Sequence, residues 1–178
     1  MPWKVHSTKD VYESKWMRLT EDEVETDFGK RLTYNVLHRD DFSLVIPWDG
    51  EKFVLVGQYR YPTDSYSWEF PMGSAEEGSP DVTATRELAE ETGMTAGAMR
   101  KLGVFYVANG HCTQACHAYL ATDLAEGEQH LDVGEEGMEV KRLSFAELSE
   151  MMNDGTIKDG PSMAATTFRV QYVCVLRR

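Results

Sequence analysis

Three glutamates in one short stretch are the residues of this chain best suited to carry chemistry. Glu90 and Glu91 follow Glu87 by three and four positions, so on a helix all three carboxylates share one face. Like charges at this spacing repel one another, and no lysine lies between them to relieve the repulsion. A divalent cation would relieve it, because Mg²⁺ prefers oxygen ligands. The triplet by itself also fits an acidic helix face that is simply solvated.

The residues around the triplet predict a helix over 80–92 that holds these side chains in place. Ser79 can cap its start, and Pro80 suits the first helical position because its φ is fixed and no N–H is needed there. Gly93 can end the helix in the left-handed conformation. Arg86 could orient one carboxylate through forked hydrogen bonds. The apolar face, opposite the glutamates, is predicted to contain Val82, Thr85, Leu88, Ala89 and Thr92.

The stretch from Gly73 to Met94 resembles the Nudix box, G-x5-E-x7-R-E-U-x-E-E-x-G-U, where U is a bulky aliphatic residue. Residues 86–94 match the second half of this pattern at every specified position. In the first half, Ser79 stands where the pattern has glutamate, and twelve rather than thirteen residues separate Gly73 from Arg86. The resemblance implies a strand–loop–helix that binds a diphosphate and Mg²⁺, or Mn²⁺. The implied metal ligands are Glu87, Glu90, Glu91 and the backbone carbonyl of Met72.

Three other segments resemble the ADP-ribose pyrophosphatase branch of the Nudix family. They are Gln58-Tyr59-Arg60, Glu69-Phe70-Pro71-Met72-Gly73 and Gly155-Thr156-Ile157-Lys158-Asp159. The resemblance implies that Arg60 and Glu69 bind substrate and that Arg86 supports catalysis, although Arg60 could also be a surface arginine. Trp16 is a candidate for stacking on an adenine base, with ordinary packing in a core or an interface as the alternative.

An acidic loop is predicted over residues 123–137. In the resembling enzymes a glutamate of this loop acts as the general base. This implies Glu136, which stands just before a predicted strand at 138–140, with Glu135 as the neighbouring choice. A solvated acidic loop is the other interpretation. The glycines that would let such a loop close on substrate are Gly127, Gly134 and Gly137.

The composition of the whole chain limits the classes of partner. The chain has 178 residues, a net charge of −12 and a pI of about 4.8. This balance argues against binding to nucleic acid or to an anionic membrane, whose phosphates attract Lys and Arg. Three cysteines do not suggest a disulfide framework and favour a cytoplasmic protein. We expect no signal peptide, because the N-terminal residues are charged and polar, and no apolar run is long enough to span a membrane.

The remaining pattern predicts an α/β protein in two parts. Residues 1–40 are expected to form an antiparallel β extension. Residues 41–178 are expected to form the Nudix domain, which the resemblance implies is an α/β/α sandwich with a mixed sheet. The extension can bury little by itself, and in the resembling branch such an extension mediates dimerisation, so a homodimer is expected.

Strands and helices follow from hydrophobic periodicity and turn residues. The predicted strands are 11–18, 32–38 after a turn near 27–29, 43–46 and 52–57 around a turn at Asp49-Gly50, 100–107, and 115–122. A second helix is predicted to begin at Ser144, in a capping box with Glu147. A third is predicted to begin at Ser162, with Met163, Thr167, Val170 and Cys174 facing inward.

Together these features predict a metal-dependent hydrolase of a small nucleotide. A diphosphate repels a nucleophile, so the site must neutralise charge and activate water. The resemblance implies cleavage of a nucleoside diphosphate sugar, with ADP-ribose giving AMP and ribose 5-phosphate. The alternative substrates are other nucleoside diphosphate derivatives and dinucleotide polyphosphates. A catalytically silent nucleotide-binding module is the alternative from another class, suggested by the altered first half of the box.

Overall fold

The computed structural model describes residues 2–75 and 79–176, with side chains described as far as residue 168. The chain divides into two compact units. One comprises Met1–Asp41 with Tyr106–Ala115, and the other comprises Phe42–Phe105 with Cys116–Arg178. Within the described part of the chain, no helix combines the length and the apolar composition that a membrane span requires.

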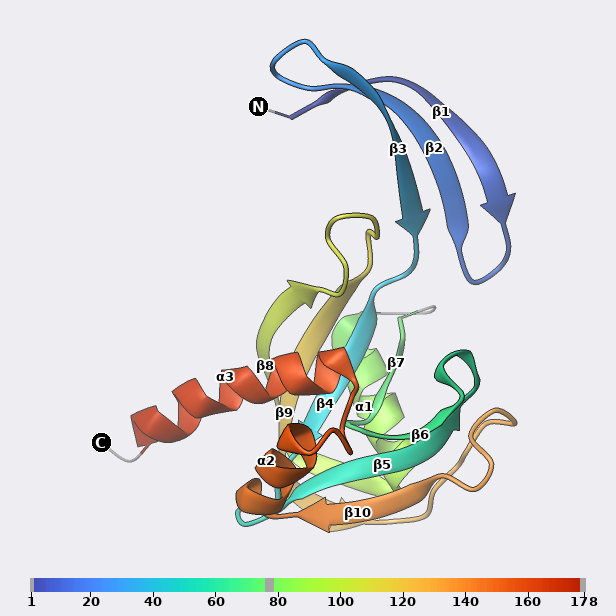
Figure 1. The fold of residues 1–178 in the computed structure, drawn as a ribbon. Helices are drawn as coiled ribbons and strands as arrows, with labels where there is room; N and C mark the ends of the chain where they lie inside the picture. The colour runs from blue at the N-terminus through green and yellow to red at the C-terminus, as the bar shows by residue number, and fades with distance from the viewer. Residues whose placement is uncertain (1, 76–78, 177–178) are drawn as a thin grey trace. The chain divides into compact units, whose positions relative to one another are not determined.

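The first unit is an antiparallel sheet of three strands in the order β1-β2-β3 (Figure 1). The strands are β1 (Lys4–Glu13), β2 (Arg18–Glu25) and β3 (Arg31–His38). Within them only Thr20 and Val24 are buried. The predicted antiparallel extension is therefore confirmed, and its own core is very small.

The turns of this sheet agree only in part with the sequence prediction. The turn near residues 27–29 is confirmed, with Gly29 at φ +71°. The predicted strand at 11–18 is wrong, because these residues end β1, turn and begin β2. The N–H of Ser14 donates to the carbonyl of Met17 at 2.9 Å, and the Ser14 hydroxyl accepts from the N–H of Trp16 at 3.2 Å. Such local bonds favour a turn over a continuous strand.

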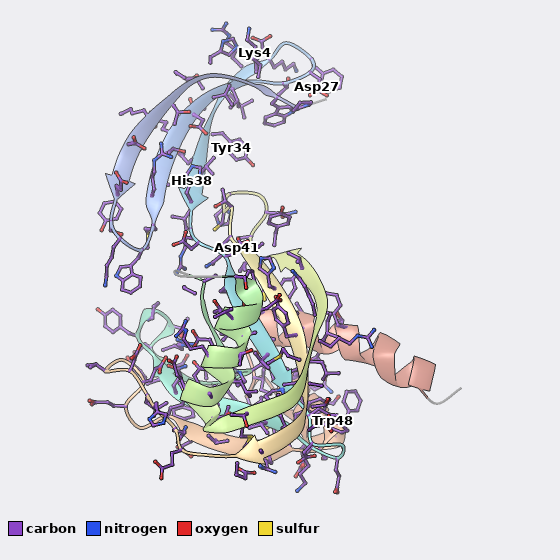
Figure 2. All side chains as sticks on the ribbon, turned by 180° about the vertical axis from the view of Figure 1, so that it is seen from behind. Lys4, Asp27, Tyr34, His38, Asp41 and Trp48 are labelled. Atoms are coloured by element: carbon purple, nitrogen blue, oxygen red, sulfur yellow. The ribbon has the colours of Figure 1, made fainter. Side chains whose placement is uncertain are left out.

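The loop over residues 107–114, which joins the strands Met94–Tyr106 and Ala115–Glu126, belongs to the same unit. The N–H of Leu37 donates to the carbonyl of His111 at 2.8 Å, and the N–H of Thr113 donates to the carbonyl of Leu37 at 3.0 Å. Tyr34, labelled in Figure 2, donates its hydroxyl to the carbonyl of Gly110 at 2.5 Å. The loop thus extends the hydrogen bonding of β3.

The second unit contains a mixed four-stranded sheet in the order β7-β4-β9-β8. Its central strand, β4 (Phe42–Pro47), is buried along its whole length. It runs parallel to β9 (Ala115–Glu126) and antiparallel to β7 (Met72–Ser74). The edge strand β8 spans Met94–Tyr106.

A second sheet, in the order β10-β5-β6, completes the strands of this unit. Its strands are β10 (Glu139–Leu143), β5 (Phe53–Arg60) and β6 (Ser65–Glu69), with the short helix η1 (Tyr61–Thr63) after β5. In Figure 1 the helix α1 (Pro80–Thr92) lies behind the sheets, and α3 (Gly160–Leu176) lies in front of them near α2 (Phe145–Asn153). The view from behind in Figure 2 reverses this order. The α/β/α arrangement with a mixed sheet is confirmed.

The structure changes several predicted strand boundaries. The turn at Asp49 is confirmed, since its carboxylate accepts from the N–H groups of Glu51 and Lys52 at 2.9 and 2.7 Å. The strands on either side of it, however, belong to different sheets, because β4 pairs with β9 and β5 pairs with β10 and β6. β8 begins at Met94 rather than at residue 100, and β9 continues to Glu126, so the acidic loop begins later than predicted.

The predicted ends of α1 are correct, although the Ser79 side chain makes no capping hydrogen bond. Its predicted inner face is correct for Leu88 and Thr92, which are buried, and wrong for Val82 and Thr85, which are exposed. Gly93 follows the helix at φ +71° and donates its N–H to the carbonyl of Ala89. The exposed fraction of Val82 is 59%, whereas Ala84 and Leu88 are buried in a cluster with Val45 and others. The helix is turned so that the carboxylates also face the protein. Its buried residues are Thr83, Ala84, Glu87, Leu88, Glu91 and Thr92.

The two later helices give one confirmation and one correction. The capping box of Ser144 and Glu147 at the start of α2 is confirmed. α3 begins earlier than predicted, where a carboxylate oxygen of Asp159 accepts from the N–H of Ser162 at 2.8 Å. Ser162 and Ala165 are buried, whereas Met163 and Thr167 are exposed, so the predicted inner face is wrong. The predicted inward side chains of Val170 and Cys174 lie outside the described ones.

Candidate active site

The centre of the site is the contact between the last turns of α1 and strand β7. Glu91 is only 2% exposed, and its carboxylate accepts from the N–H of Met72 at 3.0 Å. Glu87, 6% exposed, lies against Gly73, where an added Cβ would overlap the Glu87 carboxylate. The glycine of the box is therefore required by the close approach of the helix. Two acids and the backbone of Met72 thus meet at one place.

Arg86 contacts two of the three glutamates. Its guanidinium nitrogens lie 2.6 Å from Glu87 Oε1 and 2.6 Å from Glu90 Oε2. Glu90 is the most exposed carboxylate of the three, with a side chain 36% accessible. The predicted orienting contact is present, and Arg86 supplies positive charge to the cluster.

The electrostatics of the two buried acids follow from their position. Burial, above all, raises the pKa of Glu87 to about 7, while Arg86 opposes the rise. Burial also raises the pKa of Glu91 well above its usual value, with additional contributions from the charges of Glu87 and Glu135. Buried carboxylates in this situation favour a neighbouring cation.

The residues present fit a divalent cation by donor type. Glu87, Glu91 and the Met72 carbonyl offer oxygen, which suits Mg²⁺. In the described part of the chain, no three His, Cys, Asp or Glu side chains converge in a metal-binding arrangement. The fit therefore rests on the chemistry of the donors and on the buried negative charge.

A cleft lined in part by charged side chains adjoins this centre within the same unit. Arg60, at the end of β5, donates two hydrogen bonds to Glu69, at 3.0 and 2.5 Å, and Glu69 is buried. Both residues line a cavity of about 350 Å³ together with Met72, Lys158 and Asp159. The hydrogen bonds to Glu69 raise the pKa of Arg60, which burial alone would lower, and the charges of Glu69, Glu91 and Asp159 add to the rise. The structure thus brings Arg60 and Glu69, two of the three predicted substrate residues, next to Met72.

The acidic loop reaches the site through Glu135. This residue is half-buried, its N–H donates to the carbonyl of Asp132 at 2.8 Å, and its carboxylate accepts from the N–H of Asp132 at 3.1 Å. Its charge contributes to the raised pKa of both Glu87 and Glu91. Glu136 is exposed. Of the two predicted bases, Glu135 is thus the one whose charge acts on the carboxylates of α1.

Trp16 belongs to the other unit. It lies in the β1–β2 turn, is 53% exposed, and lines a pocket of about 230 Å³ with Arg18, His38 and Arg39 among others. The ammonium of Lys15 lies 4.0 Å from the centre of its ring. An exposed aromatic ring with neighbouring cations can stack on a base.

Two residues near the site were not assigned a role from the sequence. Asp159 ends the Gly155–Asp159 segment and lines the cleft. The resemblance of that segment to the family branch could therefore have indicated a role for Asp159. Gln129 donates its side-chain N–H to the carbonyl of Glu91 at 2.6 Å, at the end of α1. A lone glutamine in an acidic loop carries no pattern that would reveal this contact.

Comparison with known proteins assigns both units. Residues 37–165 match the NUDIX domain, and residues 3–37 match the nucleoside diphosphate sugar hydrolase N-terminal domain. The chain is 28% identical over 173 residues to an ADP-ribose pyrophosphatase of Bacillus subtilis (strain 168), covering 96% of this chain and 91% of that protein. It is 30% identical over 173 residues to a methanol dehydrogenase activator of Bacillus methanolicus, with the same coverage of 96% and 91%.

A solved structure described as an ADP compounds hydrolase shares the fold. Its TM-score is 0.88 at 20% identity, with 99% of this chain and 96% of that chain covered. The Nudix box, its buried glutamates and these matches agree, and the chain therefore belongs to the Nudix family, as a hydrolase of the nucleoside diphosphate sugar type.

Proposed function

We propose that this protein hydrolyses the diphosphate linkage of a nucleoside diphosphate sugar in a Mg²⁺-dependent reaction, with ADP-ribose as the first substrate to test. Cleavage at phosphorus would give AMP and ribose 5-phosphate. The observation that carries the proposal is the pair of buried carboxylates, Glu87 and Glu91, held against Met72 and Gly73, where Met72 also lines the cleft. The relative from Bacillus subtilis, named for ADP-ribose, supports this choice of substrate.

The metal would be held by Glu87 and Glu91 with the Met72 carbonyl, and Glu90 would contribute to a second ion. When bound, Mg²⁺ or Mn²⁺ would neutralise the diphosphate and lower the pKa of an attacking water. Arg86 keeps Glu87 and Glu90 oriented through its two contacts at 2.6 Å. This role makes Arg86 important to catalysis without contact to the reacting atoms.

Glu135 is the general base that we place first. It would accept the proton of the attacking water, because its carboxylate is half-buried and interacts with the acids of α1. Glu136 remains a second possibility in the same loop. A base of this kind contributes about 10²–10⁴-fold to the rate.

The cleft of Arg60 and Glu69 would receive the substrate beyond the reacting phosphate. Arg60 can face an anionic group, and carboxylates such as Glu69 and Asp159 can accept hydrogen bonds from sugar hydroxyls. Trp16 would stack on the base. Each of these assignments concerns binding, so loss of the side chain should raise KM more than it lowers kcat.

We further propose a cytoplasmic homodimer whose N-terminal sheets contact each other. Every residue of β1 is exposed, including Val5, Val11 and Tyr12. An isolated three-stranded sheet with so little buried surface gains stability when a second surface covers it. The odd cysteine count supports the compartment.

A substrate panel tests the proposal. Purified protein would be incubated with Mg²⁺ and ADP-ribose, a GDP-hexose, a UDP-hexose or a dinucleotide polyphosphate, and the products quantified. We expect ADP-ribose to give AMP in the highest yield. Preference for another compound would identify a different nucleoside diphosphate derivative as the substrate of the same reaction. Binding without turnover of any compound would instead favour the catalytically silent nucleotide-binding module.

A further inference from the structure

The loop between β9 and β10 is attached by hydrogen bonds to the end of α1. The side-chain N–H of Gln129 donates to the carbonyl of Glu91 at 2.6 Å, and the backbone N–H of His130 donates to the carbonyl of Glu90 at 3.0 Å. Carbonyls in the last turn of a helix have no partner within the helix. Gln129 and His130 therefore satisfy two acceptors that belong to predicted metal ligands.

Two glycines allow the loop to lie this close to the helix end. A Cβ added to Gly127 would lie 2.6 Å from the carbonyl oxygen of Gly93, and a Cβ added to Gly93 would lie 2.9 Å from the backbone nitrogen of Gln129. Gly93 also has φ +71°, which favours glycine. The first residues of the loop are thus packed against α1 by their backbone.

Gln129 and His130 fix the point at the end of α1 from which residues 131–137 continue. A few positions later, a turn closed by hydrogen bonds between Asp132 and Glu135 presents the Glu135 carboxylate. Beyond it, Arg142 of β10 contacts both Asp49 and Glu126, and so holds the two strands that flank the loop. The Gln129 side chain joins this loop to the helix of Glu87 and Glu91, next to the backbone bond of His130.

We propose that Gln129 is a positioning residue, which holds the β9–β10 loop on the end of α1 so that Glu135 faces the buried carboxylates. The proposal rests on the proposed function in one respect, the role of Glu135 as base. Gln129 does not touch the reacting atoms. Its effect on turnover should therefore pass through Glu135 and should disappear when Glu135 is removed.

The test compares Gln129→Met with His130→Ala. Methionine keeps the length of glutamine and removes the donor, whereas His130→Ala removes an exposed side chain next to it and keeps the backbone bond. Loss of one net hydrogen bond changes a local equilibrium about two- to tenfold. We expect Gln129→Met to lower kcat by about that factor with KM unchanged, and His130→Ala to leave both as they are. Gln129→Lys, which restores an N–H donor, should recover kcat.

Hydrogen–deuterium exchange provides the second measurement. Amides of residues 131–137 should exchange faster in Gln129→Met than in the wild-type protein, and α1 should stay protected. In a Glu135→Gln background, Gln129→Met should cause no further loss of kcat. An equal loss in both backgrounds would overturn the proposal, and so would unchanged exchange together with unchanged kcat. If Glu135→Gln is itself fully active, the assigned base is wrong. Faster exchange of the loop amides in Gln129→Met would even then show that Gln129 attaches the loop to α1.

Discussion

The two units of this protein bury apolar surface to very different extents. In the second unit, β4 is buried throughout and β5 is buried from Phe53 to Gln58, within clusters that include Leu44, Leu55 and Leu88. In the first unit, β1 is exposed along its whole length, and Trp16 and Phe28 are more than half exposed. One unit has an extensive core, and the described residues of the other form only a very small one.

This difference separates the roles that we assign to the units. Reacting groups need fixed positions, which a packed core provides for Glu87 and Glu91. An exposed β surface instead suits contact with a second chain or a ligand. We therefore expect changes at the buried carboxylates of the second unit to act on kcat, and changes in the first unit to act on KM and on assembly.

The largest effect should come from Glu91→Gln. The substitution keeps the shape of the side chain and removes the buried charge of a proposed metal ligand, so we expect almost complete loss of turnover with an unchanged fold. Glu87→Gln should behave alike, and Glu90→Gln should be milder because this carboxylate is more exposed. Turnover with Mg²⁺ and a circular dichroism spectrum are the measurements, with the exposed Glu150→Gln as the control. Activity of Glu91→Gln near the wild-type level would contradict the metal assignment.

The next largest effect should come from Glu135→Gln. Loss of a general base lowers kcat by about 10²–10⁴-fold and leaves substrate affinity nearly intact. Glu136→Gln, one residue later in the same loop, is the matched control, and we expect it to retain most activity. The opposite result would transfer the role to Glu136. If both variants are fully active, water is activated without this loop.

A smaller effect, on KM, should follow from Trp16→Ala. Stacking of a base on an aromatic ring contributes about 1–3 kcal/mol, so KM should rise about tenfold while kcat changes little. Phe28→Ala is the control, since Phe28 is 89% exposed in the same unit. An unchanged KM in Trp16→Ala would leave this tryptophan with a packing role only.

Assembly should respond to a charge on β1. Val5→Lys places an ammonium on a strand residue that is 57% exposed, and we expect the wild-type dimer mass to fall toward that of a monomer in light scattering at about micromolar concentration. Val82→Lys is the matched control, because Val82 is 59% exposed on α1 in the other unit. A monomeric wild-type protein would argue against the dimer outright.

Local sequence signals were sufficient for some elements and for the centre of the site. Pro80 and Gly93 defined the ends of α1, and Ser144 with Glu147 defined the start of α2, because these contacts lie within one or two turns. The Gly73-to-Met94 pattern located the buried glutamates for the same reason. The pairing of strands that lie far apart in the sequence could not be predicted. β4 and β5 are adjacent in sequence, yet β4 pairs with β9 and β5 pairs with β10, which both come from the C-terminal half.

Two features of the site, the buried face of α1 and the choice of the loop glutamate, could not be predicted from hydrophobic patterning. Patterning counts a glutamate as an outward residue, so the inner face of α1 was predicted to include Val82 and not Ala84. The choice between Glu135 and its neighbour depends on a hydrogen-bonded turn within the loop, which the sequence does not specify.

The smallest effect should be on stability, through Ser144→Ala at the start of α2. The Ser144 hydroxyl accepts from the N–H of Glu147 at 3.3 Å, and Glu147 accepts from the N–H of Ser144 at 2.7 Å. Loss of such a cap costs about 1 kcal/mol, which for a chain of this size lowers Tm by about 2–4 °C. Ser149→Ala, within the same helix, should instead leave Tm equal or slightly higher, because alanine is the better helix former.

The same cap gives this prediction a pH dependence. Hydrogen bonds from Ser144 lower the pKa of Glu147. A carboxyl whose folded pKa is lowered stabilises the protein above its ordinary pKa, and this stabilisation is lost as the pH falls through the lowered value. The Tm difference between wild type and Ser144→Ala should therefore be full at neutral pH and shrink in acid. A difference that is constant from neutral to acidic pH would show that the Glu147 charge contributes nothing to the cap.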